Sequence, residues 1–252
     1  MSHQETYYRH NEAYAEFLAN WDAAFYAKYT DALRPDRPGA RVLDVGCGAG
    51  QVIGRLAADG FEAYGVEVSE PSVARARRVC PHVEAYDGRR LPYPDAHFAA
   101  VGTLNVLEHV DEPEAFLAEL VRVAEPAARL VVSSPNFLRV LGPGYHPRMR
   151  GLARKFGNLR MLLARRQRLR AAPHAVRFER MLPILRQPFQ PDDDAIVATN
   201  PLEIAFFLER YGCTIERVEC TDRYVPRPLE WLLNLTPLKW IMFNAFVVAR
   251  RA

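Results

Sequence analysis

The sequence lacks the features that mark secreted, zinc-binding or redox-active proteins. Its 252 residues include only four cysteines, Cys47, Cys80, Cys213 and Cys220, and no two of them form a C-x-x-C pair. This spacing argues against the common zinc and dithiol redox motifs. No apolar signal core is visible in the polar first ten residues, so we expect free thiols and a reducing, cytoplasmic location.

Long hydrophobic runs, internal repeats and low-complexity tracts are missing as well. The mostly apolar stretch 243–249 is too short to span a bilayer, and its extension toward Leu229 meets Glu230, Pro237 and Lys239. We therefore expect a buried strand there. The net charge of +3 is too small to indicate a partner by itself, and a hydrophobic content of 49% is ordinary for a globular chain.

Apolar runs and helical patterns alternate along most of the chain. The patterns predict strands at 41–45, 62–68, 82–86, from 98 onward, and at 129–133, 214–220 and 242–249. They predict helices at 12–33, 51–59, 71–79 (with Ser69 as a possible N-cap), 112–124 and 202–211. This alternation indicates an α/β fold with a parallel sheet covered on both faces. An arginine- and proline-rich stretch, 135–200, interrupts it.

A glycine-rich turn follows the first predicted strand. Residues 44–50 read Asp-Val-Gly-Cys-Gly-Ala-Gly, which allows a sharp turn and a close approach of backbone to a ligand. Glu67 ends the second strand, where a carboxylate can accept hydrogen bonds from ribose hydroxyls. Asp87 follows the third strand and could accept from an adenine amino group. These three loops meet at the carboxyl edge of a doubly wound sheet, which predicts a nucleotide-type cofactor site.

Two other classes of protein remain open at this point. A nicotinamide-dependent oxidoreductase would carry G-x-G-x-x-G/A, but its third position is Gln51 here, and the spacing is G-x-G-x-G. A catalytically silent cofactor-binding protein has the same turn and carboxylate, so the motif alone does not separate it from an enzyme.

Residues 41–135 together resemble class I S-adenosylmethionine-dependent methyltransferases of the small-molecule type. The turn at 44–50 looks like their motif I, residues 91–98 (LPYPDAHF) resemble their LPFPDxSF segment, and residues 105–110 resemble the segment after their fourth strand. The resemblance implies a Rossmann-like, doubly wound seven-stranded sheet whose last strand is antiparallel, with a helical insertion after strand 5.

The resemblance also implies a binding site for S-adenosyl-L-methionine. Its residues would be Asp44, Gly46, Cys47, Gly48, Glu67, Val68, Asp87, Gly88 and Asn105. Glu67 would bind the ribose, Asp87 with Gly88 would lie near adenine, and Asn105 would lie near the methionyl tail. His109 is the candidate catalytic residue, as a general base or as a residue that orients the loop.

We expect no metal ion in this site. The ubiquinone-type O-methyltransferases carry E-x-x-E-H, a proposed metal site, whereas this chain has Asn105-x-x-Glu108-His109 and lacks one ligand candidate.

The expected organisation has three parts. Residues 1–40 would form an N-terminal helical lid whose tyrosines Tyr7, Tyr8 and Tyr14 could close over the cofactor. Residues 41–135 and 200–252 would form the core, and residues 136–199 a basic insertion that recognises the methyl acceptor.

Acidic residues are nearly absent from residues 148–186, which hold twelve lysines and arginines and one acid, Glu179. This basic segment is consistent with a solvated helix face, with an anionic small-molecule acceptor, or with a peripheral membrane contact. An RNA methyltransferase is the alternative, and we expect nucleic acid less because apolar residues interleave with the arginines.

Overall fold

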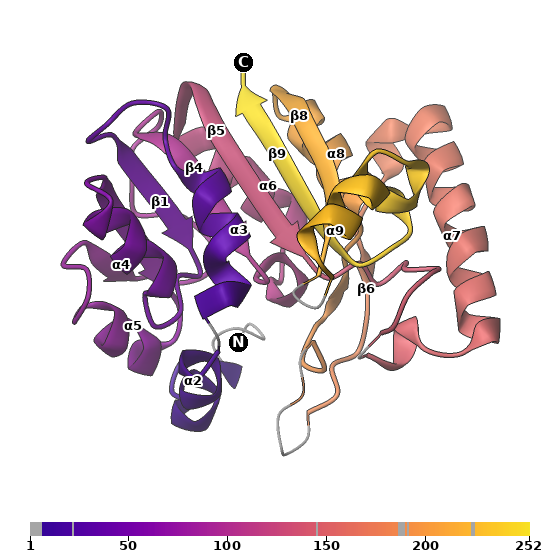
Figure 1. Cartoon of the computed structure of the whole chain (residues 1–252), viewed down its shortest axis with the longest axis horizontal. Helices are drawn as coiled ribbons and strands as arrows, with labels where there is room; N and C mark the ends of the chain where they lie inside the picture. Colours follow the sequence, from indigo (N-terminus) through magenta and orange to yellow (C-terminus); the bar gives the residue numbers. More distant parts are fainter. Residues whose placement is uncertain (1–6, 22, 145, 186–189, 191, 223–224) are drawn as a thin grey trace.

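A seven-stranded sheet in the order β3-β2-β1-β4-β5-β9-β8 forms the centre of the molecule (Figure 1). The structure is a computed structural model that describes residues 7–252 except 22, 145, 186–189, 191 and 223–224. The strands of this sheet are β1 Arg41–Val45, β2 Glu62–Glu67, β3 Val83–Ala85, β4 Phe98–Leu104, β5 Ala124–Ser134, β8 Cys213–Thr221 and β9 Asn244–Arg251.

The strand directions confirm the predicted fold class. The first five strands pair in parallel, whereas β9 pairs antiparallel with both β5 and β8. Strand β5 is longer than its apolar run predicted, because it begins at Ala124 and passes an irregular position at Ala127, where φ is +61°.

Helices cover both faces of the sheet. Helices α3 (Ala23–Leu33), α4 (Gln51–Ala58) and α5 (Glu70–Ala76) pack on one face, and α6 (Pro113–Val123) and α8 (Pro201–Arg210) pack on the other. Local signals set their starts: Ser69 Oγ accepts a hydrogen bond from the Ser72 amide, and Asn200 Oδ1 accepts one from the Glu203 amide. The predicted N-cap at Ser69 is thereby confirmed.

The N-terminal helix differs from the prediction. The pattern predicted one helix over 12–33, but the structure has two, α2 (Glu12–Ala19) and α3, separated at Asn20 and Trp21. The Asn20 amide side chain donates to the carbonyl of Glu16, and its backbone N–H bonds to Leu18. These bonds end α2 locally, although the apolar spacing continues across the break.

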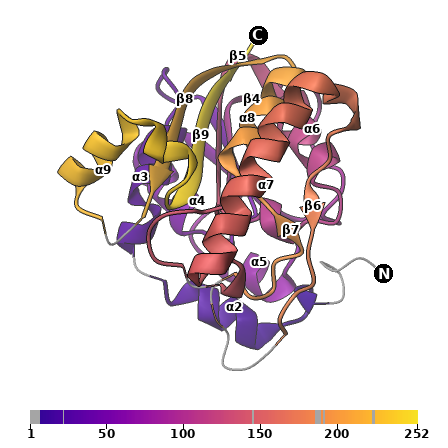
Figure 2. The same cartoon turned by 90° about the vertical axis from the view of Figure 1, so that its right-hand side faces the viewer.

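The segment 136–199 leaves the sheet after β5 and returns before α8. It contains η2 (Pro147–Met149), α7 (Leu152–Ala171), η3 (Pro173–Ala175), β6 (Glu179–Arg180) and β7 (Val197–Ala198). Figure 2 shows α7 on the outside of the molecule, in front of α8. The β6–β7 pair is a second, two-stranded sheet that the sequence pattern did not predict.

Helix α9 (Arg227–Asn234) and η4 (Pro237–Trp240) connect β8 to β9. The last two predicted strands are therefore antiparallel neighbours joined by helical structure. None of the described helices is both long enough and apolar enough to cross a membrane.

Candidate active site

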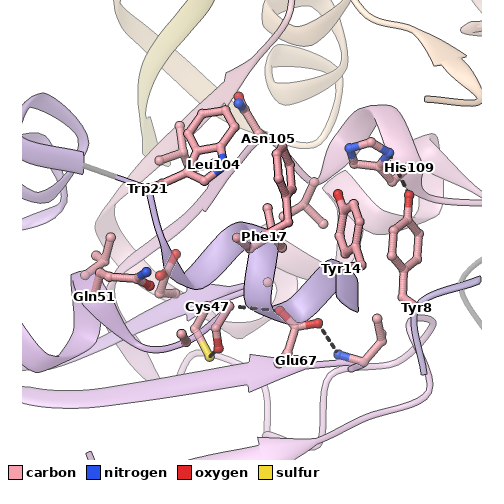
Figure 3. Close-up of a pocket in the computed structure, with 18 of the residues that line it drawn as sticks. Tyr8, Tyr14, Phe17, Trp21, Cys47, Gln51, Glu67, Leu104, Asn105 and His109 are labelled. Atoms are coloured by element: carbon pink, nitrogen blue, oxygen red, sulfur yellow. Dashed lines mark hydrogen bonds between the residues drawn. The ribbon is translucent and has the colours of Figure 1, made fainter. Parts of the chain in front are cut away.

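A cavity lies at the carboxyl ends of β1, β2 and β4, beneath the N-terminal helices (Figure 3). The described residues that line it come from six parts of the chain. They are Tyr8, Tyr14, Phe17, Leu18, Trp21, Phe25, Tyr26, Asp44, Gly46, Cys47, Gly48, Ala49, Gln51, Val52, Glu67, Val68, Tyr86, Leu104, Asn105, Val106, His109, Gln190, Asp192 and Asp194. Seven of the nine predicted cofactor residues line this cavity, and so does His109. The seven are Asp44, Gly46, Cys47, Gly48, Glu67, Val68 and Asn105.

Two glycines of the turn, Gly46 and Gly48, have different structural roles. Gly46 has φ +77°, and a Cβ built there would lie 2.3 Å from the Val106 side chain. Gly48 has φ +53°, and a Cβ there would meet no atom within 4 Å. Gly46 is therefore required by packing against the loop after β4, whereas Gly48 faces open space in the cavity.

Glu67 is held in place by the backbone of two loops. Its carboxylate accepts hydrogen bonds from the amides of Gly48 (3.0 Å), Val68 (2.7 Å) and Ser69 (3.0 Å). Burial raises the pKa of Glu67, and these three backbone bonds act in the opposite direction. A carboxylate has about four lone-pair directions, so one direction is left for a ligand in the cavity.

Asp44 lies beneath the turn and is almost completely buried. The Tyr29 hydroxyl of α3 donates to its Oδ1 at 2.7 Å. Burial raises the pKa of Asp44 to about 7, the Tyr29 bond lowers it, and the charge of Glu67 raises it again. The two carboxylates thus form an acidic floor next to the glycine turn.

Asp87 and Gly88 are not among the described residues that line the cavity. Asp87 Oδ1 accepts hydrogen bonds from the amides of Arg89 and Arg90, which shape its own loop. Tyr86, one position earlier, lines the cavity instead. The assignment of Asp87 and Gly88 to adenine therefore stays a prediction, with Tyr86 as a neighbour that the motif did not indicate.

Asn105 has an uncommon backbone conformation and an unsatisfied side chain. Its φ is +53°, and its amide donates to the carbonyl of Ser133. The buried Oδ1 makes no hydrogen bond to any described residue. An orphaned acceptor in the cavity wall, beside the open space at Gly48, fits a bound ligand that carries a donor such as an amino group.

His109 belongs to a short hydrogen-bonded chain that reaches the N-terminal segment. Its Nδ1 lies 3.0 Å from the Tyr8 hydroxyl, which in turn donates to Asp194 Oδ2 at 2.7 Å. His109 Nε2 lies 3.6 Å from Glu108 Oε1. The sequence did not indicate Asp194, because it lies 85 positions beyond His109 and only the fold brings the two together.

Aromatic side chains of α2 and of the segments on either side of it form the roof of the cavity. Ring centroids are 5.0 Å apart for Tyr8 and Tyr14, 6.1 Å for Tyr14 and Phe17, and 5.9 Å for Phe17 and Trp21. Of the three tyrosines named from the sequence, Tyr8 and Tyr14 line the cavity and Tyr7 is not among the described lining residues, whereas Phe17 and Trp21 continue the row (Figure 3). Closure of these side chains over a cofactor stays a prediction.

The arginines of the basic segment lie elsewhere. No described residue of 148–186 lines the cavity, and Arg186 falls outside the described residues. Arg165, inside α7, pairs with Glu203 at 2.8 Å and Glu179 at 3.3 Å. Among the described residues, no group of three or more His, Cys, Asp or Glu side chains is arranged to hold a metal ion.

Comparison with known proteins places this architecture in a class. Residues 43–132 match the family model described as a methyltransferase domain. The chain is 39% identical over 99 residues to a demethylmenaquinone methyltransferase of Beutenbergia cavernae, covering 38% of this chain and 41% of that one. It is 34% identical over 134 residues to a ubiquinone biosynthesis O-methyltransferase of Hahella chejuensis, covering 46% and 56%.

A solved structure extends the likeness of fold to most of the chain. An S-adenosylmethionine-dependent methyltransferase from Mesorhizobium loti superposes with a TM-score of 0.59 at 20% identity, covering 91% of this chain and 98% of that one. The chain spans about two fifths of the length of the first curated relatives that it matches.

Residues 43–132 therefore match a methyltransferase domain, and the resemblance to class I, S-adenosylmethionine-dependent methyltransferases is confirmed at the level of the class. That the cavity at the ends of β1, β2 and β4 binds the cofactor stays a prediction.

Proposed function

We propose that this chain transfers a methyl group from S-adenosylmethionine to a small-molecule acceptor bound in the same cavity. The observation that carries the proposal is the convergence of Gly48, Glu67, Asn105 and His109, from the carboxyl ends of three strands, on one cavity. Relatives named for demethylmenaquinone and for ubiquinone biosynthesis support a small-molecule acceptor.

The chain would act mainly by position. Bound S-adenosylmethionine supplies a methyl group activated by its sulfonium. Glu67 would accept from a ribose hydroxyl, Asn105 Oδ1 from the amino group, and Gly48 would leave room for the cofactor chain. The aromatic roof of Phe17 and Trp21 would exclude water, and the acceptor would be oriented in line with the carbon–sulfur bond.

His109 would serve as the proton acceptor where the methyl acceptor must lose a proton. Because the Tyr8 hydroxyl gives its hydrogen to Asp194, its contact with His109 requires Nδ1 to be the donor. Neutral His109 then keeps its lone pair on Nε2, which is the form that a general base needs.

The role of His109 is open to a direct test. We expect His109→Asn to lower kcat, with little change in the KM for the cofactor. If His109 only holds Tyr8 over the site, the KM for the cofactor will rise instead, with little change in kcat.

The acceptor would bind between the aromatic roof and the loop at 190–194, so the lid and the insertion would both contribute to its recognition. An anionic acceptor held by the arginines of 148–186 is not part of this proposal, because the described arginines do not line the cavity. The proposal does include a cytoplasmic location, because all four cysteines are free and buried.

The proposal is tested by methyl transfer itself. The chain is incubated with S-adenosylmethionine and a panel of phenols, quinols, amines, sugar nucleotides and RNA, and formation of S-adenosylhomocysteine is measured. We expect acceptor-dependent product with at least one small molecule and none with RNA. Cofactor binding without turnover on any acceptor would support the silent cofactor-binding alternative.

A further inference from the structure

Beside the tyrosines of the roof, the wall of the cavity is acidic. It is formed by Gln190, Asp192 and Asp194, which precede β7 and lie outside the matched methyltransferase domain. Asp194 Oδ2 lies 2.7 Å from the Tyr8 hydroxyl and 3.9 Å from His109 Nδ1. This wall is therefore continuous with the place where the acceptor would sit.

A third carboxyl group stands behind this wall. Glu108 is completely buried, and Ser134 donates to its Oε2 at 2.8 Å. Its Oε1 makes no hydrogen bond to any described residue, since His109 Nε2 is 3.6 Å away. A fully buried carboxyl with an unsatisfied oxygen at this position is costly unless a donor or a cation approaches it.

The carboxyl groups also raise one another's pKa. Burial and then the charge of Asp192 raise the pKa of Glu108, and burial and then the charge of Asp194 raise the pKa of Asp192 to about 7. Arg139 acts in the opposite direction on Asp192, but it is not among the lining residues. A cation in the cavity would relieve the repulsion that remains.

The aromatic rings of the roof are a second feature of the cavity that favours a cation. Tyr8, Tyr14, Phe17 and Trp21 present ring systems along the same cavity (Figure 3). The faces of aromatic rings attract ammonium groups, most strongly where water is excluded. Among the described lining residues four are aspartate or glutamate, and none is lysine or arginine.

We propose that the methyl acceptor carries a basic amine, whose ammonium group binds against Asp194 and Asp192 beneath the aromatic roof. This inference rests on the proposed function and names the charge of its acceptor. An anionic acceptor would enter a cavity whose described lining holds four carboxyl groups and no lysine or arginine, whereas an ammonium group gains from both the carboxylates and the rings.

The test uses three probes with the same ring and chain length. These are 2-phenylethylamine, 2-phenylethanol and phenylacetate, each titrated into the chain saturated with S-adenosylhomocysteine and followed by ligand-observed NMR. We expect the amine to bind at least about tenfold more tightly than the alcohol, and phenylacetate to bind weakest of the three. Equal affinities, a preference for phenylacetate, or no binding of the amine would overturn the proposal.

Variants separate this site from other sources of charge preference. Asp194→Asn keeps an oxygen acceptor for Tyr8 while it removes the charge, and we expect it to abolish most of the preference for the amine over the alcohol. Glu209→Gln, on the exposed side of α8, makes the same change in net charge and should leave the preference intact. A preference that survives in both Asp194→Asn and Asp192→Asn contradicts the assignment.

The cofactor provides the last distinction. If the acidic wall serves the positive charges of S-adenosylmethionine itself, Asp194→Asn will weaken cofactor binding, and the amine proposal is wrong. We expect unchanged cofactor affinity in this variant. Failure of S-adenosylhomocysteine to bind the unmodified chain would count against the proposed function, whereas its binding without an amine preference would count against the amine alone.

Discussion

Glu67 shows how a single carboxylate links two parts of the site. It ends β2, yet it fixes the glycine turn after β1 through the Gly48 amide and its own loop through Val68 and Ser69. We therefore expect a substitution to change both the proposed contact with the ribose and the shape of the glycine turn.

We expect Glu67→Gln to weaken S-adenosylmethionine binding by about 2 kcal/mol. The variant loses a charge-assisted hydrogen bond to the cofactor and turns an amide donor toward backbone N–H groups. Calorimetric titration measures the effect. Glu62→Gln, at the exposed start of the same strand, is the matched control and should bind as the unmodified chain does. Equal affinity in the two variants would remove Glu67 from the site.

The two glycines should respond differently to alanine. Gly46→Ala places a Cβ against Val106 at a positive φ, and we expect the free energy of unfolding to fall by roughly 3 kcal/mol. Gly48→Ala carries only the cost of its positive φ, about 1 kcal/mol, while its methyl group enters cofactor space. Thermal unfolding and cofactor titration separate the two effects, and equal losses of stability would contradict this difference.

Sequence alone predicted which residues of the candidate site lie together. Asp44, Gly46, Gly48, Glu67, Asn105 and His109 line one cavity, because each lies at or just after the carboxyl end of a strand of the same parallel sheet. The run of three acids at 192–194 is visible in the sequence because it follows a long basic segment. Its place beside Tyr8 and His109 depends on the contact between Tyr8 and Asp194, which are 186 positions apart along the chain. No local pattern contains that information.

At the scale of elements, most boundaries follow from local chemistry. β1 matches its predicted range at both ends, and α4, α5, α6 and α8 were predicted in place from helical spacing and caps. The break between α2 and α3 was missed because apolar spacing continues through it. The first half of β5 was missed because Glu125, Pro126 and the alanines after them lack a strand pattern.

The arginines of helix α7 include one that pairs with a buried carboxylate and others that are exposed to solvent. Arg165 is the partner of Glu203, which is almost completely buried, whereas Arg166 is exposed. We expect Arg165→Ala to lower the free energy of unfolding by roughly 3 kcal/mol, because a buried carboxylate loses its ion pair. Arg166→Ala should change it by less than about 0.5 kcal/mol. Chemical denaturation compares them directly.

The effect of Arg165→Ala should also depend on pH. Burial raises the pKa of Glu203 to about 7, and Arg165 lowers it. A carboxyl group whose pKa is raised on folding binds more protons in the folded state than in the unfolded state. Its contribution to the free energy of unfolding therefore falls as the pH rises from about 4 to 7. Loss of Arg165 raises that pKa further, and the variant should be less destabilised at pH 5 than at pH 8. An equal loss at both values would exclude Glu203 as the cause.

At the scale of the whole molecule, the cavity joins segments of different origin. Its floor comes from the methyltransferase domain at 43–132, and its roof and acidic wall come from the N-terminal helices and the segment before β7. The curated relatives align with only part of the chain, so they support the cofactor class, whereas recognition of the acceptor by the remaining segments belongs to the proposal.

The central claim is that this chain binds S-adenosylmethionine, rather than a dinucleotide, at the ends of β1 and β2. Gln51 stands where a dinucleotide fingerprint needs a small residue, and its side chain lies 3.5 Å from the carbonyl of Ala19 in the cavity wall. The decisive measurement is a calorimetric titration of the full chain with S-adenosylmethionine and, separately, with NAD. We predict one-to-one binding of S-adenosylmethionine and no binding of NAD at the same concentration. Binding of NAD without binding of S-adenosylmethionine would contradict the account.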